Sequence, residues 1–577
     1  MSWRRTVGAA GLLRVFNDAD VIGAADVHVA QRVTTMAGES DPHVMLALAL
    51  LVRALRGGSV CLDLQAIKEQ IGGADLPWPA PESWLAAVRA SPLVRSPTVL
   101  RIDANNLLYL DRYWREEQQA ADDLLALLPA PGPVNTPRMT AATNRLFPPG
   151  YEEQGEAASV ALSQGLTVLT GGPGTGKTTT VARLLALFAE QAQVAGLPRL
   201  RMALAAPTGK AAASLQEAVR VAVDQLDSAD RQRLSGLQAT TLHRLLGRRP
   251  DTSSRFRHHR GNRLPHDVIV VDETSMVSLT MMARLLEAVR PTTRLLLAGD
   301  PNQLSSVEAG AVLADLVDGF KARGSTPVVT LKTAHRFGES IGELAESIRA
   351  GDVDRVIDVL SAGGDHVEWI HDGNPADSLR NVLVPQALQL RQAAILGDAS
   401  TAISALDEHR LLCAHRHGPY GVAHWNQQIE RWLTDATGEP IWSSWYAGRP
   451  VLVTTTNYGL GIYNGDNAVT VARDGRLRVA FAAAGDPLEI APSRLSDVDT
   501  MYAMTIHKSQ GSQADDVTVL LPSANSRLLT RELFYTAVTR AKRKVRVVGS
   551  MASVRAAIER RALRATGLRL RLRAAPR

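Results

Sequence analysis

The sequence predicts an α/β protein built around two parallel sheets. Short apolar runs recur between longer helical segments in two series, the first starting at Leu166 and the second at Pro327. Strands that are apolar on both faces and separated by helices form parallel sheets that helices cover on both sides. A glycine-rich phosphate-binding motif directly follows the first run, and this is the position that such a fold gives to a phosphate loop.

The bulk composition is that of a globular protein with several domains. A chain of 577 residues exceeds what one hydrophobic core usually supports, so about three or four domains are expected. The longest apolar run, from Val44 to Val52, is too short to span a bilayer, and no signal peptide is recognisable. Cys61 and Cys413 show no disulfide or metal spacing, so both are expected to be core thiols. We expect a cytoplasmic location and no membrane partner.

The positive charge is concentrated at the C-terminus. The net charge is +6, but residues 555–577 alone hold eight arginines and one glutamate. The remaining 56 basic and 57 acidic residues nearly cancel. The overall charge therefore says little about partners, and the tail is either a solvated basic terminus or a phosphate-binding arm.

A small, mainly helical domain is expected at the N-terminus. Helical periodicity covers residues 41–56, and a second helix containing a tryptophan follows at 84–90. The stretch "VLRIDANNLLYLDRYW" predicts two short strands about a turn at 104–106, followed by a long helix through Leu128. The proline-rich "PAPGPVNTP" then marks a linker.

The two series of strands are interrupted once. Between Arg449 and Asp497, short alternating strands with turns at "NGD" and "RDGR" predict a small β-barrel inserted into the second α/β domain. The strands of the first series start at Leu166, Met202, Val268 and Leu295, and those of the second at Pro327, Arg410, Val517 and Val545.

The stretch "GGPGTGKT" matches the phosphate-loop pattern through Gly171, Gly176, Lys177 and Thr178. Glycines allow backbone N–H groups to surround the phosphates, and the following helix begins with its positive dipole end toward them. In this pattern Lys177 meets the β and γ oxygens and Thr178 binds Mg²⁺. A phosphate loop alone also fits kinases and transporters.

Acidic and amide side chains after two later strands favour a hydrolase. "VIVVDETSM" ends a strand in Asp272 and Glu273, of which Asp272 would hold Mg²⁺ and Glu273 would deprotonate the attacking water. "LLLAGDPNQLSSVEAG" places Asp300 and Gln303 at the carboxyl end of the next strand, where open parallel sheets bind ligands. Gln303 is therefore a candidate γ-phosphate sensor.

Eight motifs in order carry a resemblance to the superfamily-one DNA helicases, closest to the RecD family, the alpha subunits of exodeoxyribonuclease V. They are "GGPGTGKTTT", "APTGKAAASL", "TTLHRLLG", "VVDETSM", "LAGDPNQLSSVEAG", "AHRF", "MTIHKSQGS" and "LFYTAVTRAK". The resemblance extends to the N-terminal "GGSVCLDL" and "LLYLDRYW" and so covers nearly the whole chain.

The resemblance implies a division of the chain. It implies two RecA-like parallel-sheet motor domains, a small helical N-terminal domain that docks a RecC-like subunit, and an inserted SH3-like β-barrel. The implied bounds are 1–125 for the N-terminal domain, 126–325 for the first motor domain, 326–440 and 500–577 for the two parts of the second, and 441–499 for the barrel.

The resemblance also implies site residues. Arg336 and Arg540 resemble the arginines that reach the γ-phosphate from the second domain, and such a fixed bidentate charge suits a phosphoryl transition state. The implied catalytic set is Lys177, Asp272, Glu273, Gln303, Arg336 and Arg540, with ATP and Mg²⁺ as cofactors and Thr178 and Asp272 on the metal. The implied nucleotide contacts are Gln154, Gly171, Gly172, Pro173, Gly174, Thr175, Gly176, Lys177, Thr178 and Thr179. The implied DNA contacts are Pro207, Thr208, Gly209, Lys210, Thr241, His243, Thr505, His507, Lys508 and Ser509.

The resemblance also implies an activity, which is ATP-driven 5′ to 3′ movement on single-stranded DNA from duplex ends. It implies a heterotrimer with RecB-like and RecC-like subunits. This complex would act in double-strand break repair and homologous recombination. Two alternatives stay open: a free-standing RecD-like helicase, and an assembly subunit that binds ATP without motor activity. No metal-dependent nuclease constellation is recognisable, so no nuclease site is expected in this chain.

Overall fold

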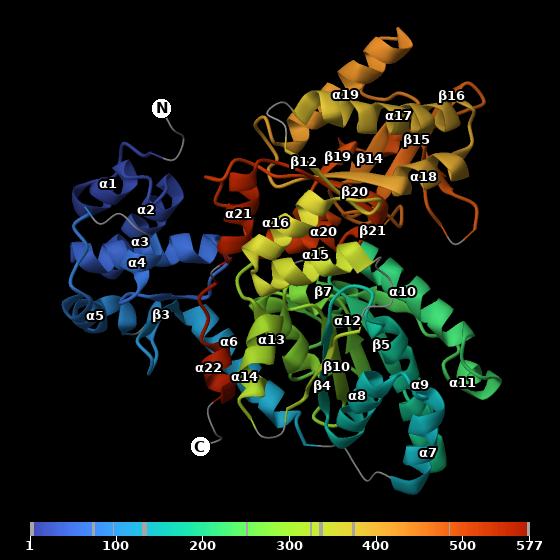
Figure 1. Ribbon diagram of the computed structural model, residues 1–577. Coiled ribbons are helices and arrows are strands. Elements are labelled where there is room, and N and C mark those ends of the chain that lie inside the picture. Colours follow the sequence, from blue (N-terminus) through green and yellow to red (C-terminus); the bar gives the residue numbers. More distant parts are fainter. Residues whose placement is uncertain are drawn as a thin grey trace.

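The computed structural model describes residues 5–573 except 72–74, 96, 130–135, 250–251, 324–325, 334–338, 372–374, 458, 484 and 563, and without the side chains of 136–139, 253–254 and 339. Arg336 lies outside these residues, and so does most of the predicted linker. Figure 1 shows two stacked α/β domains and a separate N-terminal lobe. In the described chain no helix is both long and apolar enough to cross a membrane.

The first α/β domain contains a six-stranded sheet in the order β11-β4-β10-β9-β5-β6, and every pair in it is parallel. Each residue of β4, β9 and β10 is buried, which confirms the prediction that these apolar runs are covered on both faces. The strands are β4 (Leu166–Gly171), β5 (Met202–Ala206), β6 (Ala239–Thr241), β9 (Val268–Val271), β10 (Arg294–Gly299) and β11 (Val328–Leu331).

The strand β11 was expected to open the second series, and that expectation was wrong. It pairs in parallel with β4, with Val328 opposite Val168 and Leu331 opposite Gly171. The helix α14 (Val312–Lys321) carries the chain back to the free edge of β4. The first sheet therefore extends beyond residue 325, because periodicity identifies a strand but not the sheet that it joins.

The second α/β domain contains a five-stranded parallel sheet in the order β12-β21-β20-β13-β19. Its strands confirm the runs predicted near Arg410, Val517 and Val545. They are β12 (Val367–Ile370), β13 (His409–Cys413), β19 (Ala503–Thr505), β20 (Ala514–Leu520) and β21 (Ala541–Val548). The helices that cover it include α15 (Glu339–Ala350), α16 (Val353–Ala362), α17 (Pro375–Ile395), α18 (Ala399–Glu408), α19 (Val422–Thr437), α20 (Arg531–Val538) and α21 (Met551–Glu559).

An antiparallel sheet is inserted between β13 and β19, as predicted. Its strands β14 (Pro450–Val453), β15 (Asn467–Arg473), β16 (Arg476–Phe481), β17 (Leu488–Ile490) and β18 (Val498–Thr500) pair in the order β17-β16-β15-β14-β18. Both predicted turns are present, with positive φ at Gly465, Asp474 and Gly475. Among the described residues the edge strands β17 and β18 do not pair with each other. Closure into an SH3-like barrel stays a prediction.

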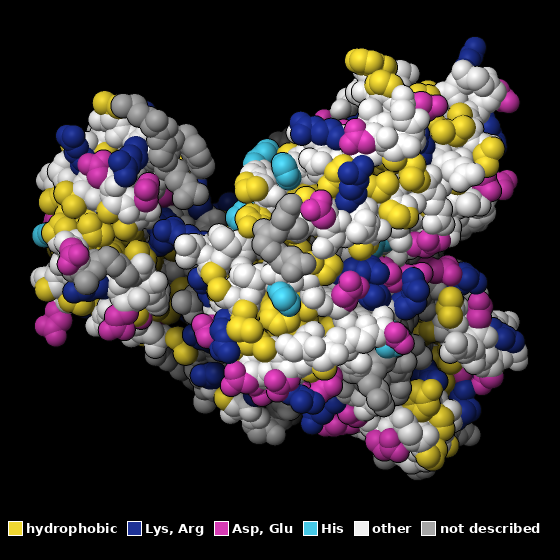
Figure 2. All heavy atoms as spheres, turned by 45° about the horizontal axis from the view of Figure 1, so that its top comes forward, with side chains coloured by type: hydrophobic (Ala, Val, Ile, Leu, Met, Phe, Trp, Pro, Cys, Tyr) yellow, Lys and Arg dark blue, Asp and Glu magenta, His cyan; other side chains and the backbone are white. Residues whose placement is uncertain are grey.

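The N-terminal lobe packs helices around a small antiparallel sheet. Its central helix α3 (Pro42–Arg56) begins where the Asp41 side chain accepts from the His43 N–H, and it buries most of its apolar residues. The sheet order is β1 (Cys61–Asp63), β3 (Leu107–Leu110), β2 (Leu100–Ile102). The other helices of the lobe are α1 (Gly11–Asp18), α2 (Ala24–Ala37), α4 (Ile67–Ile71) and α5 (Pro81–Ala90). In Figure 2 the lobe stands apart from the main body over much of its height.

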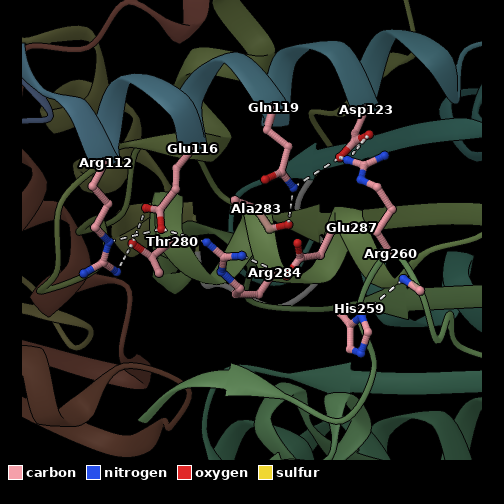
Figure 3. Close-up of polar contacts among 11 residues, drawn as sticks. Arg112, Glu116, Gln119, Asp123, His259, Arg260, Thr280, Ala283, Arg284 and Glu287 are labelled. Carbon is pink, nitrogen blue, oxygen red and sulfur yellow. Dashed lines mark hydrogen bonds and ion pairs between the residues drawn. The ribbon is translucent and has the colours of Figure 1, made fainter. Parts of the chain in front are cut away.

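The long helix α6 (Asp111–Ala126) fastens this lobe to the first α/β domain. It lies along α13 (Leu279–Ala288), and polar side chains of the two helices face each other in a row (Figure 3). The buried Glu116 accepts from Arg284 at 3.0 Å and from the Thr280 hydroxyl at 2.7 Å. Gln119 donates to the Ala283 carbonyl at 2.9 Å. Because these partly buried groups are paired across the two helices, the lobe has a defined orientation on the domain.

The basic C-terminus folds back across the molecule as a C-terminal strap, defined as residues 564–573. Its helix α22 (Leu568–Arg573) buries Leu568 and Leu572 against α14. The fully buried carboxylate of Glu117 on α6 accepts from the Arg571 guanidinium at 2.9 Å and from the Gly567 N–H at 3.0 Å. The expectation of a free, solvated terminus was therefore wrong for this part of the tail, because leucines alternate with its arginines and supply an apolar face. A phosphate-binding role stays a prediction.

A buried carboxyl under the strap predicts a pH-dependent stability. Burial raises the pKa of Asp315 on α14 to about 8, and its Oδ2 has no partner among the described residues. Because the folded-state pKa lies above the ordinary value of 3.8, the stability contribution of this carboxyl is lost as pH rises from 3.8 to about 8.

Asp315→Asn should therefore raise the melting temperature at about pH 8.5 and change it little at about pH 5. Thermal melts at the two pH values check this, with the exposed Asp318→Asn as the matched control. An equal shift at both pH values would contradict the assignment.

Candidate functional site

The phosphate loop joins β4 to α9 (Lys177–Val194) with left-handed backbone at Gly174 and Gly176, both at φ 80°. A Cβ on Gly171 would lie 2.5 Å from the Thr175 hydroxyl oxygen and 2.8 Å from the Leu331 carbonyl oxygen, so only glycine fits there. The Lys177 amine donates to the carbonyl oxygens of Gly171 and Gly172 at 2.8 and 2.9 Å. The loop thus holds the lysine amine over its own concave backbone.

The two predicted acids follow β9 directly. Burial raises the pKa of Asp272 to about 6, and the charge of Glu273 is the second cause of this shift. The Glu273 N–H donates to Asp272 Oδ1 at 2.9 Å. Glu273 itself has φ 51°, a left-handed conformation that is strained for a residue with a side chain. Such strain is common at functional sites, where the surrounding structure enforces it.

Gln303 and Asp300 lie buried after β10. The Gln303 amide donates to Asp300 Oδ2 at 3.3 Å, but its Oε1 is buried without a partner in the described part of the chain. Buried polar atoms are nearly always paired with protein or water. An unpaired acceptor here fits a bound water or a hydroxyl donor beside Asp300.

The second α/β domain supplies a buried guanidinium to the same place. Arg540 donates to the carbonyl oxygens of Thr536 at 3.1 Å and Ser512 at 3.3 Å. Burial lowers its pKa, and the charges of Glu273 and then Asp300 in the first domain oppose this shift. The second predicted arginine, Arg336, lies outside the described residues.

Three further contacts close the seam between the two domains. The Tyr535 hydroxyl donates to Asp300 Oδ2 at 2.9 Å. The Leu304 N–H donates to the Thr536 hydroxyl at 2.8 Å, and the Gln510 amide donates to the Leu304 carbonyl at 2.7 Å. The segment after Gln303 is therefore held by both domains.

The threonines predicted to contact DNA all stand immediately before a helix or a helical turn. Thr208 precedes α10 (Gly209–Asp224), Thr241 precedes α12 (Leu242–Leu246) and Thr505 precedes the 3₁₀ turn Ile506–Ser509. Each hydroxyl accepts a backbone N–H at 3.2 Å. The Ser509 hydroxyl donates to the Ile506 carbonyl. These hydroxyls thus shape the backbone at the carboxyl ends of β5, β6 and β19.

Both predicted DNA-contacting lysines meet one turn of the inserted sheet. Lys508 donates to Asn464 Oδ1 at 2.7 Å, and Lys210 donates to the Asn467 amide oxygen at 2.8 Å. A Cβ on Gly209 would lie 2.4 Å from the Tyr463 Cβ, so this glycine is needed for the close packing of the turn. Burial lowers the pKa of Lys210 to about 8. Both lysines therefore already have a side-chain partner in the inserted domain.

The remaining predicted residues are placed as follows. Gln154 is buried on α8 (Glu152–Ser163), and the neighbouring Glu153 accepts from the N–H groups of Lys332 and Thr333 at 2.8 and 3.3 Å. His243 packs edge-on against the Phe256 ring. The residues that are partly exposed are Gly172, Pro173, Thr178, Thr179, Pro207 and His507.

Three family models match the chain. Residues 18–109 match "RecBCD enzyme subunit RecD, N-terminal domain", residues 150–372 match an AAA domain, and residues 500–548 match the UvrD-like helicase C-terminal domain. The RecBCD enzyme subunit RecD of Mycolicibacterium smegmatis is 67% identical over 98% of this chain and 99% of its own length. The chain belongs to the RecD family. This RecD chain is accordingly an ATP-dependent DNA helicase of superfamily one.

RecD relatives include proteins of a different length. The ATP-dependent RecD2 DNA helicase of Deinococcus radiodurans is 32% identical over 81% of this chain, but the match covers only 59% of that protein. Among solved structures, the Pif1 helicase from Candida albicans aligns with a TM-score of 0.39 and 15% identity over 70% of this chain and 95% of that one.

Sequence reasoning missed several residues that the structure places beside the predicted ones. Tyr535 lies within the motif "LFYTAVTRAK", about one and a half helical turns before Arg540. This spacing could have indicated that Tyr535 lies near the same site. The sequence predicted only a turn near Tyr463, Asn464 and Asn467. Their contacts could not be predicted, because their partners lie on distant segments of the chain. No group of three or more potential metal-ligating side chains occurs among the residues that the structure describes.

Proposed function

We propose that this RecD-family chain is the 5′ to 3′ single-stranded DNA translocase of a RecBCD-type complex with RecB-like and RecC-like subunits, and that it acts in double-strand break repair and homologous recombination. Its full-length match to a RecD subunit, against 59% coverage of the RecD2 helicase, supports the subunit over a free-standing helicase. We also propose a cytoplasmic location and the domain bounds given by the resemblance, with β11 moved to the first motor domain.

The residues present fit a nucleoside triphosphate with Mg²⁺. Only glycine fits at Gly171, Lys177 lies across the loop mouth, and the buried Gln303 Oε1 lacks a partner. In this proposal Thr178 and Asp272 hold Mg²⁺, which neutralises charge on the phosphate oxygens when bound. Glu273 takes the proton of the attacking water, and Gln303 Oε1 accepts from that water and orients it.

The observation that carries the proposal is the seam between the two parallel-sheet domains. Tyr535 from the second domain donates to Asp300 of the first, and the charges of Glu273 and Asp300 act on the buried Arg540, which supports one site shared by both domains. A charge that develops on phosphate oxygens in this seam would attract Arg540 and draw the domains together. Loss of that charge would release them, and repeated closing and opening moves the strand-contacting segments.

The proposed DNA path runs over the helix starts at Thr208, Thr241 and Thr505. First-turn N–H groups grip phosphates without reading bases, which suits a motor that must move over any sequence. Lys210 and Lys508 are held by neutral asparagine oxygens. A phosphate oxygen is a stronger, charge-assisted acceptor than an amide, so a strand can displace these partners.

Strand displacement with defined overhangs tests the proposal. The full chain, alone and with its RecB-like and RecC-like partners, should unwind a duplex with a 5′ single-stranded overhang and not one with a 3′ overhang. ATP turnover should rise on addition of single-stranded DNA. A preference for the 3′ overhang would overturn the polarity, and turnover that DNA never stimulates in either form would favour an assembly subunit without motor activity.

A further inference from the structure

The C-terminal strap crosses the loop that follows Gln303. We call residues 304–310 the sensor loop, because they continue from Gln303. Arg564 of the strap donates from one guanidinium nitrogen to the carbonyl oxygens of Glu308 and Gly310, both at 3.1 Å. The guanidinium is half-buried and lies against the N-terminal lobe, where a Cβ on Gly58 would be 2.8 Å from its central carbon.

The sensor loop is bound by the second α/β domain, by the N-terminal lobe and by the strap. Its first residue, Leu304, contacts Thr536 and Gln510 of the second α/β domain. Near its end, the Gly310 N–H donates to the Gly58 carbonyl of the N-terminal lobe at 2.9 Å. The loop therefore connects the seam between the two α/β domains to the lobe within a few residues. Arg564 binds the end of the loop that contacts the lobe.

The strap is itself fixed on both sides of Arg564. Before it, the Arg560 carbonyl accepts from Arg531 N–H at 2.8 Å in the second domain. After it, the Ala565 carbonyl accepts from the Val60 N–H at 2.8 Å, and Gly567 is bound by Glu117. The chain is therefore bound to the second domain before Arg564 and to the lobe and α6 after it.

Arg564 also lies near the proposed DNA path. Burial lowers the pKa of His507, and the positive charge of Arg564 lowers it further. His507 belongs to the motif that begins at Thr505, so the charge of Arg564 acts on the proposed DNA path.

We propose that Arg564 is a positioning residue that couples the state of the ATP site to the N-terminal lobe by fixing the sensor loop. One guanidinium nitrogen carries two N–H groups, so it can donate to both carbonyl oxygens, and its permanent charge strengthens these bonds. This proposal rests on the proposed function, since it assigns a route for the signal that hydrolysis generates.

Kinetics of Arg564→Ala test the coupling. The maximal DNA-stimulated turnover should fall about tenfold, while the DNA concentration for half-maximal stimulation should change less than about threefold, because the strand contacts are intact. Arg564→Lys should restore part of the turnover, since an ammonium group can still donate to both carbonyls. Arg561→Ala, at an exposed arginine nearby in the chain, is the matched control. A folded Arg564→Ala protein with unchanged maximal turnover, or with only its DNA affinity reduced, would overturn the proposal.

Hydrogen exchange separates this proposal from the proposed function. The full chain is compared with and without a non-hydrolysable ATP analogue and Mg²⁺, in the absence of DNA. In the natural protein, exchange should change at residues 304–310 and at 57–61 together. In Arg564→Ala the change should persist at 304–310 and disappear at 57–61. Joint changes in both proteins would contradict the route through Arg564, whatever the unwinding polarity proves to be.

Discussion

Glu273→Gln should lower DNA-stimulated ATP turnover by about a hundredfold to ten-thousandfold, the range for losing a general base. Glutamine keeps the shape of the side chain but cannot accept the proton of the attacking water. The left-handed φ of 51° at this residue and the adjoining Asp272 show that the local backbone holds it at the end of β9. Nucleotide binding should persist, because Lys177 and the loop glycines are unchanged.

Turnover and nucleotide affinity are the two measurements needed. Release of phosphate in the presence of single-stranded DNA gives the first, and binding of a fluorescent ATP analogue gives the second. Glu156→Gln, an exposed glutamate on α8, is the matched control and should leave both quantities unchanged. A Glu273→Gln protein that retained turnover within about threefold would exclude this residue as the base.

Glu117→Ala should destabilise the folded protein by about 3 to 5 kcal/mol, the usual consequence of removing one partner of a buried ion pair. Glu117 is fully buried and accepts from Tyr109, Thr566, Gly567 and Arg571. Its loss leaves these donors without an acceptor and releases the strap from α6. Urea unfolding followed by circular dichroism and by limited proteolysis of the strap measures the effect.

Two companion variants sharpen this test. Asp122→Ala, at an exposed carboxylate on the same helix, should change the stability by less than about 0.5 kcal/mol. In a double-mutant cycle, Arg571→Ala combined with Glu117→Ala should be less destabilising than the sum of the two single changes, because the first substitution already breaks the pair. Additive effects would mean that Glu117 does not act through Arg571.

Most individual strands and the chemistry of the phosphate loop could be predicted from sequence. The apolar runs at β4, β9 and β10 are short and continuous and lie between helical segments, as expected for strands buried on both faces. Gly171, Lys177, Asp272 and Gln303 lie at strand ends, where neighbouring parallel strands bring them together whatever the rest of the fold does. These features depend on residues close together in the chain.

The sequence by itself thus determined the two series of strands, the phosphate loop, the acidic pair and the inserted antiparallel sheet, because periodicity and turn residues act over a few positions. Only the tertiary structure decided that β11 joins the first sheet, that Asn464 and Asn467 hold the two lysines, and that the basic tail packs on Glu117. In each case the partners are far apart in the chain. Such pairings are selected by complementary burial and charge once the domains pack, and no local pattern records them.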